Sequence, residues 1–241
     1  MINTFAQIDF LASAGSTPWH RASALSKLVL TLVLVAEAVF SPSWVVLALT
    51  LGTALALCAT ARMPAALIAT AASTPVLFAF IFVVAHYRGD VRDVVVLGMR
   101  PIVASLAALW LVGTTPYPDL FAPLSRVLPR QLGDSLFLTY RAVFALIARV
   151  ERLWRALFLR GAMTGPVTRR AHMMGEAMGV VVLSGFDRSH RLYQVMTLRG
   201  HSGRICGCRH WLELGREDVW VFLCIVWIVS AAAAFSGVRL A

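Results

Sequence analysis

Residues 65–85 read AALIATAASTPVLFAFIFVVA, an uninterrupted run that contains no charged side chain. A helix needs roughly 17–25 residues of this apolar character to cross the hydrocarbon core of a bilayer. A helix satisfies its own backbone hydrogen bonds in lipid, whereas an isolated strand leaves them unpaired. This run therefore predicts a transmembrane helix and, with it, an α-helical membrane protein.

Four further apolar runs lie on either side of this one. The runs are Leu25–Phe40, Trp44–Ala61, Val94–Val112 and Val219–Phe235. The first and last are short, and we expect Lys27 and Arg239 to reach the membrane surface and extend them. Arg100 and Pro101 interrupt the run at Val94–Val112. The predicted fold class is all-α, a polytopic membrane protein with about five transmembrane helices.

Composition and charge indicate which parts face the cytoplasm. Hydrophobic residues make up 59% of the 241 residues and charged residues 14%, against about 45–50% and about 25% in soluble domains. Most of the basic residues lie between Tyr117 and Glu217, which the positive-inside rule assigns to the cytoplasm. We expect a multi-pass protein of a prokaryotic plasma (inner) membrane, with its N-terminus and this basic region cytoplasmic.

Three regions follow from this reading. Residues 1–113 are expected to form an N-terminal membrane bundle of about four helices, residues 114–217 a cytoplasmic helical region, and residues 218–241 a C-terminal transmembrane helix. The cytoplasmic region is predicted to contain a short helix over Asp119–Leu128 and a long one that begins with Asp134 or Ser135 as N-cap and ends at Gly161. A second long helix is expected from about Thr168 to Arg199. We expect its glycines, Gly175, Gly179 and Gly185, to interrupt it.

The two long helices end in similar sequences. Residues 152–161 read RLWRALFLRG and residues 191–200 read RLYQVMTLRG, so half of the positions are identical. Upstream, Arg149 corresponds to Arg188, about three helical turns before the final arginine of each segment. Arginine and glycine also end helices for local reasons, because arginine complements the helix dipole and glycine adopts the left-handed conformation. Their recurrence after the same leucine favours two equivalent docking points for two copies of one partner.

The chain resembles the transmembrane T component of energy-coupling factor (ECF) transporters, of the CbiQ/NikQ type found in cobalt and nickel importers. The resemblance covers most of the chain and depends on the order of several short motifs. That family closes its two cytoplasmic coupling helices with Ala-Arg-Gly or Ala-Arg-Ser, and this chain has Leu159 and Leu198 in place of the alanines. The matching segments are LSKL (25–28), RMP (62–64), TTP (114–116), YR (140–141) and DRS (187–189), with the two Arg-Gly pairs.

This resemblance implies a scaffold and coupling subunit of an ECF-type ABC importer, for cobalt or nickel ions. The implied partners are two ATP-binding cassette ATPase subunits and a membrane-embedded substrate-binding (S) subunit. The chain itself is then no enzyme and binds no cofactor, because the partner subunits use the ATP. The residues that this resemblance assigns to ATPase docking are Leu159, Arg160, Gly161, Leu198, Arg199 and Gly200, and we expect Arg149 and Arg188 to form a supporting basic face.

Motifs of nucleotide hydrolysis do not occur in the sequence. It contains no G-x-x-x-x-G-K-[ST] phosphate loop, and Lys27, its one lysine, has no glycine beside it. A short cluster of potential metal ligands does occur, but its C-x-C-x-H spacing is not a common structural zinc pattern. We therefore expect a loop with incidental thiols and no metal site there. The cluster consists of His201, Cys206, Cys208 and His210.

Other functions remain open at this point. The same scaffold serves importers of vitamins such as biotin, and the arginines also suit contact with anionic membrane lipid. A membrane-embedded enzyme acting on a phosphorylated lipid is a further alternative, although no constellation of acids and histidines lies at a useful spacing. A lipid-anchored structural protein without an ATPase is another. Nucleic acid is not an expected partner, because the basic residues alternate with an apolar stripe close to the membrane.

Overall fold

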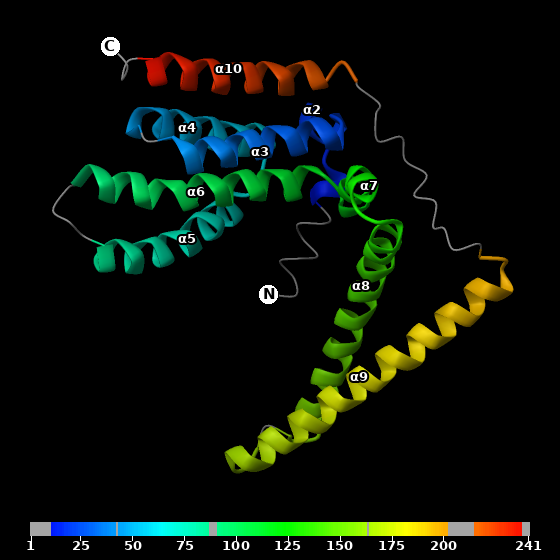
Figure 1. Cartoon of the computed structure of the whole chain (residues 1–241). Coiled ribbons are helices and arrows are strands. Elements are labelled where there is room, and N and C mark those ends of the chain that lie inside the picture. The colour runs from blue at the N-terminus through cyan, green and yellow to red at the C-terminus, as the bar shows by residue number, and fades with distance from the viewer. Residues whose placement is uncertain (1–10, 42, 87–90, 163, 202–214, 238–241) are drawn as a thin grey trace. The chain divides into compact units, whose positions relative to one another are not determined.

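A computed structural model of the chain describes residues 11–41, 43–86, 91–162, 164–201 and 215–237. Every regular element within these segments is an α-helix, which confirms the predicted all-α class (Figure 1). The chain divides into two compact units. One consists of residues 1–123 and 209–241, and the other of residues 124–208.

The first unit is a bundle whose five long helices coincide with the five predicted apolar runs. Helix α6 packs against α3, α4 and α5, and α10 packs against α3 and α4. Figure 1 shows these helices running alongside one another. The helices are α3 (Ala24–Phe40), α4 (Trp44–Thr60), α5 (Ala65–His86), α6 (Val91–Thr114) and α10 (Asp218–Gly237).

The interior of this bundle is small and mostly apolar. Leu30, Leu57 and Ile228, from three different helices, are buried together around the indole of Trp110. The short helix α2 (Pro18–Arg21) brings Trp19 edge-on to Trp110, with ring centroids 5.9 Å apart and an interplanar angle of 76°. The residues before the first span therefore pack against the end of α6.

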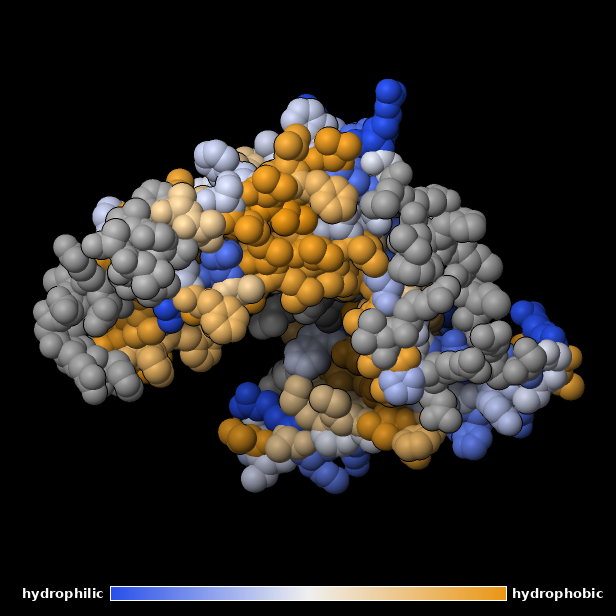
Figure 2. All heavy atoms as spheres, turned by 45° about the horizontal axis from the view of Figure 1, so that its top comes forward, coloured by the Kyte–Doolittle hydropathy of each residue, from blue (hydrophilic) through white to orange (hydrophobic). Residues whose placement is uncertain are grey.

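The outer surface of the bundle is also apolar. Phe78 and Phe80 of α5 are 69% and 68% exposed, and Val226 of α10 is 63% exposed. Figure 2, which turns the α10 side of the molecule forward, shows a broad continuous area of hydrophobic side chains. Large apolar areas of this kind are rare on soluble monomers. The chain is thus a polytopic membrane protein whose apolar surface faces lipid.

Among the described residues, two helices are long and apolar enough to cross a membrane by length and composition. They cover Ala65–Val83 of α5 and Val94–Thr114 of α6, and Trp44–Thr60 and Asp218–Ala234 are shorter apolar helices. Pro101 does not break α6, and Arg100 next to it donates a hydrogen bond from Nη2 to the carbonyl of Ser41, at 3.1 Å. At the predicted interruption α6 is thus continuous, and its arginine makes a polar contact with the end of α3.

Lys27 does not reach the membrane surface, so that prediction was wrong. Its side chain is buried, with 1% of its surface exposed, and its Nζ donates a hydrogen bond to the carbonyl of Thr114, at 3.0 Å. The last carbonyls of a helix lack partners within the helix and attract cations. The end of α6 therefore holds the lysine inside the protein. Arg239, the other predicted extension, lies outside the described residues.

The second unit contains the two longest helices, α8 (Arg130–Leu159) and α9 (Val167–Leu198), which contact each other over a short stretch. Helix α7 (Tyr117–Val127) leads into it across the boundary between the units. The predicted start of α8 at Asp134 or Ser135 was wrong. Pro129 is the N-cap, and its carbonyl accepts hydrogen bonds from Leu132 and Gly133. Proline suits this place because a helix start needs no donated N–H.

Helix α9 is continuous, so the predicted interruptions were also wrong. Gly175, Gly179 and Gly185 all lie within the helix, and none has a positive φ. An exposed helical glycine costs about 1 kcal/mol relative to alanine, which weakens a helix without ending it. Apart from the chain neighbours and the backbone of α9 itself, no described atom lies within 4 Å of where a Cβ would stand at any of the three. In the described part of the chain, no other helix packs closely against α9 at these glycines.

Candidate functional site

The C-terminal ends of α8 and α9 each have a hydrogen-bonded cap, and the two caps are of the same type. At the end of α8, the N–H of Gly161 donates to Phe158 at 3.1 Å and that of Ala162 donates to Leu157 at 3.0 Å. At the end of α9, the corresponding donors are Gly200, to Thr197 at 3.0 Å, and His201, to Met196 at 3.0 Å. This paired pattern is a Schellman motif, which satisfies the last carbonyls of a helix.

The backbone angles at the two ends agree closely. Arg160 has φ −83° and ψ 5°, and Arg199 has φ −86° and ψ 10°. The next residues, Gly161 and Gly200, have φ 67° and 74°. This left-handed conformation is easy for glycine and costs other residues about 1–2 kcal/mol. The recurring Leu-Arg-Gly sequence therefore folds twice into the same local shape.

The arginines at these ends are free to bind a partner. Arg160 and Arg199 are exposed, and neither side chain has an ion pair or hydrogen bond with any residue that the structure describes. Leu159 and Leu198, the last helical residues, are 85% and 87% exposed. Each end thus presents an apolar side chain and a guanidinium next to each other.

The predicted supporting residues Arg149 and Arg188 are exposed on α8 and α9. Each lies about three turns before the final arginine, so both residues of a pair lie on similar faces of their helix. Glu151 and Arg155, one turn apart on α8, form an ion pair at 2.8 Å, with both side chains at least half exposed. An ion pair so exposed contributes little stability.

The two ends lie toward opposite ends of α9. Only residues 161–166 separate Arg160 from Val167, the first residue of α9, and Arg199 directly follows the last. Helix α9 has 32 residues and is about 48 Å long at the usual rise per residue. The two arginines are therefore on the order of 40 Å apart along this unit.

A polar network that the sequence analysis missed joins the starts of α3 and α10. Asp218 is 2% exposed. Its Oδ1 accepts hydrogen bonds from the backbone N–H of Ser23 at 2.8 Å and from the hydroxyl of Ser26 at 2.5 Å, and its Oδ2 accepts one from the N–H of Gly215 at 2.7 Å. The sequence signal was an acid, Asp218, directly before an apolar run. Its role here is structural.

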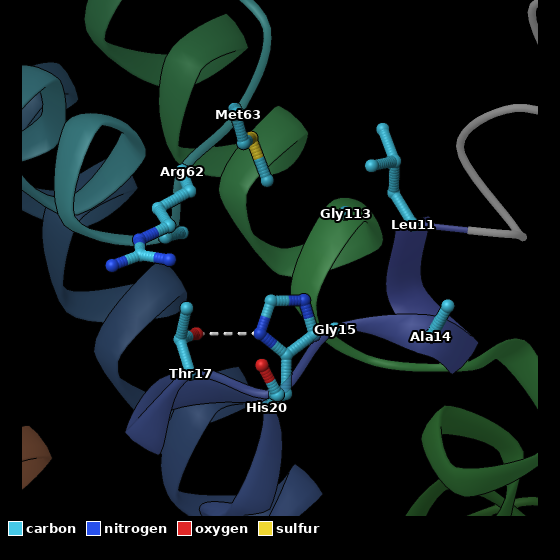
Figure 3. A pocket seen from close by; sticks show the side chains of 10 residues that line it. Leu11, Ala14, Gly15, Thr17, His20, Arg62, Met63 and Gly113 are labelled. Atoms are coloured by element: carbon cyan, nitrogen blue, oxygen red, sulfur yellow. Dashed lines mark hydrogen bonds between the residues drawn. The ribbon is translucent and has the colours of Figure 1, made fainter.

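A small cavity of about 190 Å³ lies where α2, α4 and α6 meet. His20, Arg62 and Met63 are among its lining residues (Figure 3). Nδ1 of His20 is 2.6 Å from the hydroxyl of Thr17. Burial, followed by the positive charge of Lys27, lowers the pKa of His20 below 6.5. The cavity thus holds a histidine that favours its neutral form.

The predicted absence of a metal site at His201, Cys206, Cys208 and His210 stays a prediction. Of these residues the structure describes His201 alone, next to the end of α9, and the other three lie outside the described residues.

Comparison with known families identifies the chain. The model of the cobalt transport protein family, CbiQ, matches residues 15–207, which include both Leu-Arg-Gly ends. No curated protein matches the chain. Since the family model covers most of its length, the chain belongs to the CbiQ family of cobalt transport proteins and is a membrane transporter component.

Proposed function

We propose that this chain is the coupling subunit of an ECF-type ABC importer for cobalt ions. It joins two ATPase subunits to a membrane-embedded substrate-binding (S) subunit in a prokaryotic plasma membrane, with α8 and α9 on the cytoplasmic side. The observation that carries the proposal is the duplicated helix end, with Arg160 and Arg199 exposed in the same local geometry. The membership in a cobalt transport family supports it.

The chemistry of the two ends suits docking to a protein. A guanidinium offers a planar set of donors that binds carboxylates and backbone carbonyls in a fixed orientation. The Schellman cap holds each arginine at the end of a helix of about 30 residues or more. Two ends about 40 Å apart suit two copies of the same ATPase better than two contacts with one copy.

Coupling then follows from the stiffness of the helices. ATP binding in the partner subunits changes the distance between their two docking grooves. Because α8 and α9 are continuous helices, a displacement at either end moves the helix as a body. The chain supplies levers and contacts and carries out no bond-breaking step, so its role is non-catalytic.

The test is co-purification with the cobalt-importer ATPase of the same organism, co-expressed with the chain. The variants are Arg160→Glu, Arg199→Glu and the double variant, with Arg216→Glu as the control. Arg216 is equally basic and exposed but lies just before α10. Charge reversal at a desolvated contact costs about 2–5 kcal/mol.

We expect each single reversal to weaken ATPase retention, the double reversal to abolish it, and the control to retain it. All variants should still be recovered from the membrane fraction. Wild-type retention by the double variant would refute the docking role of these ends.

The cargo is tested separately, by uptake of Co²⁺, Ni²⁺ and biotin into cells that express the complete importer. The family supports cobalt over a vitamin, and we expect Co²⁺ accumulation that the double reversal removes. Biotin uptake without Co²⁺ uptake would contradict the cargo assignment.

A further inference from the structure

The two helix ends carry the two most exposed large hydrophobic side chains in the described part of the chain. Leu159 is 85% exposed and Leu198 is 87% exposed, and Phe40 follows at 82%. Both leucines hold the same position, immediately before the arginine that ends the helix. Chance exposure of an apolar residue is common on proteins, but it does not explain why the extreme cases occupy equivalent positions.

The leucines have no packing role within the part of the chain that the structure describes. With at most about a seventh of its surface covered, neither side chain stabilises α8 or α9 by burial. The leucine side chains are also not needed for the helix caps, because the Schellman motifs are formed by backbone N–H groups and by the left-handed Gly161 and Gly200. Their apolar surface is therefore available to a partner.

The neighbouring groups indicate what kind of surface would cover them. Arg160 follows Leu159 directly, and Arg199 follows Leu198. A complementary surface needs an apolar pocket next to acceptors for a guanidinium, such as carboxylates or backbone carbonyls. Because the two backbone geometries agree, one surface can fit both ends.

We propose that Leu159 and Leu198 are hydrophobic anchors, each inserted into an apolar pocket of one ATPase subunit beside the acceptors that bind the arginine. The inference rests on the proposed function and adds a requirement on the partner: a pocket with room for a leucine side chain. Residues of this kind, central and fully covered in the complex, contribute most of the affinity of protein interfaces.

The test measures the affinity of the detergent-purified chain for the purified ATPase by biolayer interferometry. The variants are Leu159→Ala, Leu198→Ala, the double variant, and Leu→Met at both positions as volume-conserving changes. Val167→Ala is the matched control, because Val167 is an apolar residue of α9 that is 74% exposed. Arg160→Glu is measured alongside them.

Loss of a buried leucine side chain corresponds to a weakening of about tenfold. We expect about this effect for each alanine variant, a larger one for the double variant, and affinities within about threefold of wild type for the methionine variant and the control. Melting temperatures should be unchanged, since the side chains are exposed.

Three outcomes overturn the inference, and they are distinguishable. If Arg160→Glu weakens binding but the alanine variants do not, the leucines are not anchors and the proposed function stands. If none of these variants weakens binding, the docking role itself is wrong. If the double alanine variant loses binding to vesicles of anionic phospholipid while it binds the ATPase normally, the leucines contact the membrane.

Discussion

The hydroxyl of Ser26 donates a hydrogen bond to the carboxylate of Asp218, although the two residues are 192 positions apart in the chain. Ser23, the N-cap residue of α3, makes no capping bond with its own side chain, and its N–H donates to the same carboxylate. Asp218 thus caps α3 from another helix, with its negative charge at the positive end of the helix dipole. This contact fastens the last span to the first.

Replacing Asp218 with alanine should destabilise the bundle. The N–H groups of Ser23 and Gly215 and the hydroxyl of Ser26 would lose their acceptor, and an unsatisfied buried donor costs about 1–3 kcal/mol. We expect a lower thermal unfolding temperature of the detergent-purified protein, with a smaller decrease for Asp218→Asn. Asp187→Ala, at an exposed position of α9, is the control. Equal melting of both alanine variants would contradict this role.

Lys27 and Asp218 should depend on each other energetically. Both are buried, and the negative charges of Asp119 and, to a smaller extent, of Asp218 act on the Lys27 ammonium. Removing one of the two charges takes a favourable interaction away from the other, whereas removing the second charge as well costs no further interaction between them. In a cycle of Lys27→Met, Asp218→Asn and the double variant, we expect a coupling of about 0.5–3 kcal/mol in the free energy of unfolding. Purely additive losses would show that the two charges do not interact.

Glycine at position 62 should relieve the backbone strain that Arg62 imposes after α4. It follows the end of α4 with φ 56°, and its N–H and that of Met63 donate to Ala59 and Cys58 in the same cap pattern as at the ends of α8 and α9. A side chain in this conformation costs about 1 kcal/mol. Arg62→Gly should therefore melt at a higher temperature than Arg62→Ala, a comparison that removes the effect of the guanidinium. The reverse order would mean that the strain is not present in the protein.

The stability of the protein should decrease as the pH falls below about 6.5. Burial and the charge of Lys27 lower the pKa of His20 in the folded state, so the unfolded state binds a proton at a higher pH than the folded state does. Stability from the neutral ring is thus fully present above the unfolded pKa and is lost as the pH falls through the folded one.

The measurement for His20 is the melting temperature between about pH 5 and pH 8, for wild type and His20→Gln. We expect a smaller decrease toward acid pH in the variant. His172, an exposed histidine of α9, serves as the control in His172→Gln. An identical pH dependence of wild type and His20→Gln would refute the assignment.

The sequence was sufficient to predict the helices of the bundle, because each apolar run is continuous and lipid leaves the backbone no alternative. The ends of α8 and α9 could also be predicted, since Leu-Arg-Gly carries its own capping signal. The start of α8 could not. Asp134 and Ser135 are good N-caps in general, yet Pro129 begins the helix, and Ser135 donates to the carbonyl of Leu132 within it.

Contacts between distant segments were the other part that could not be predicted. A lysine near the start of an apolar run ordinarily reaches toward water, and nothing local to Lys27 indicates the carbonyl of Thr114 as its partner. In the same way, Asp218 gives no sign of Ser23 and Ser26. Such pairs depend on how the helices pack, which the pattern of one run does not contain.

The unbroken course of α9 has a consequence for how the protein can change in evolution. Each residue added to a continuous helix advances its far end by about 1.5 Å and also rotates it by about 100°. One insertion between Val167 and Leu198 would turn Arg199 away from its former direction while leaving Arg160 in place. Substitutions on the exposed faces of α9 have no such effect. Among relatives that share the two-point mode of docking, the number of residues between the two arginines should therefore be conserved more strictly than the residues themselves.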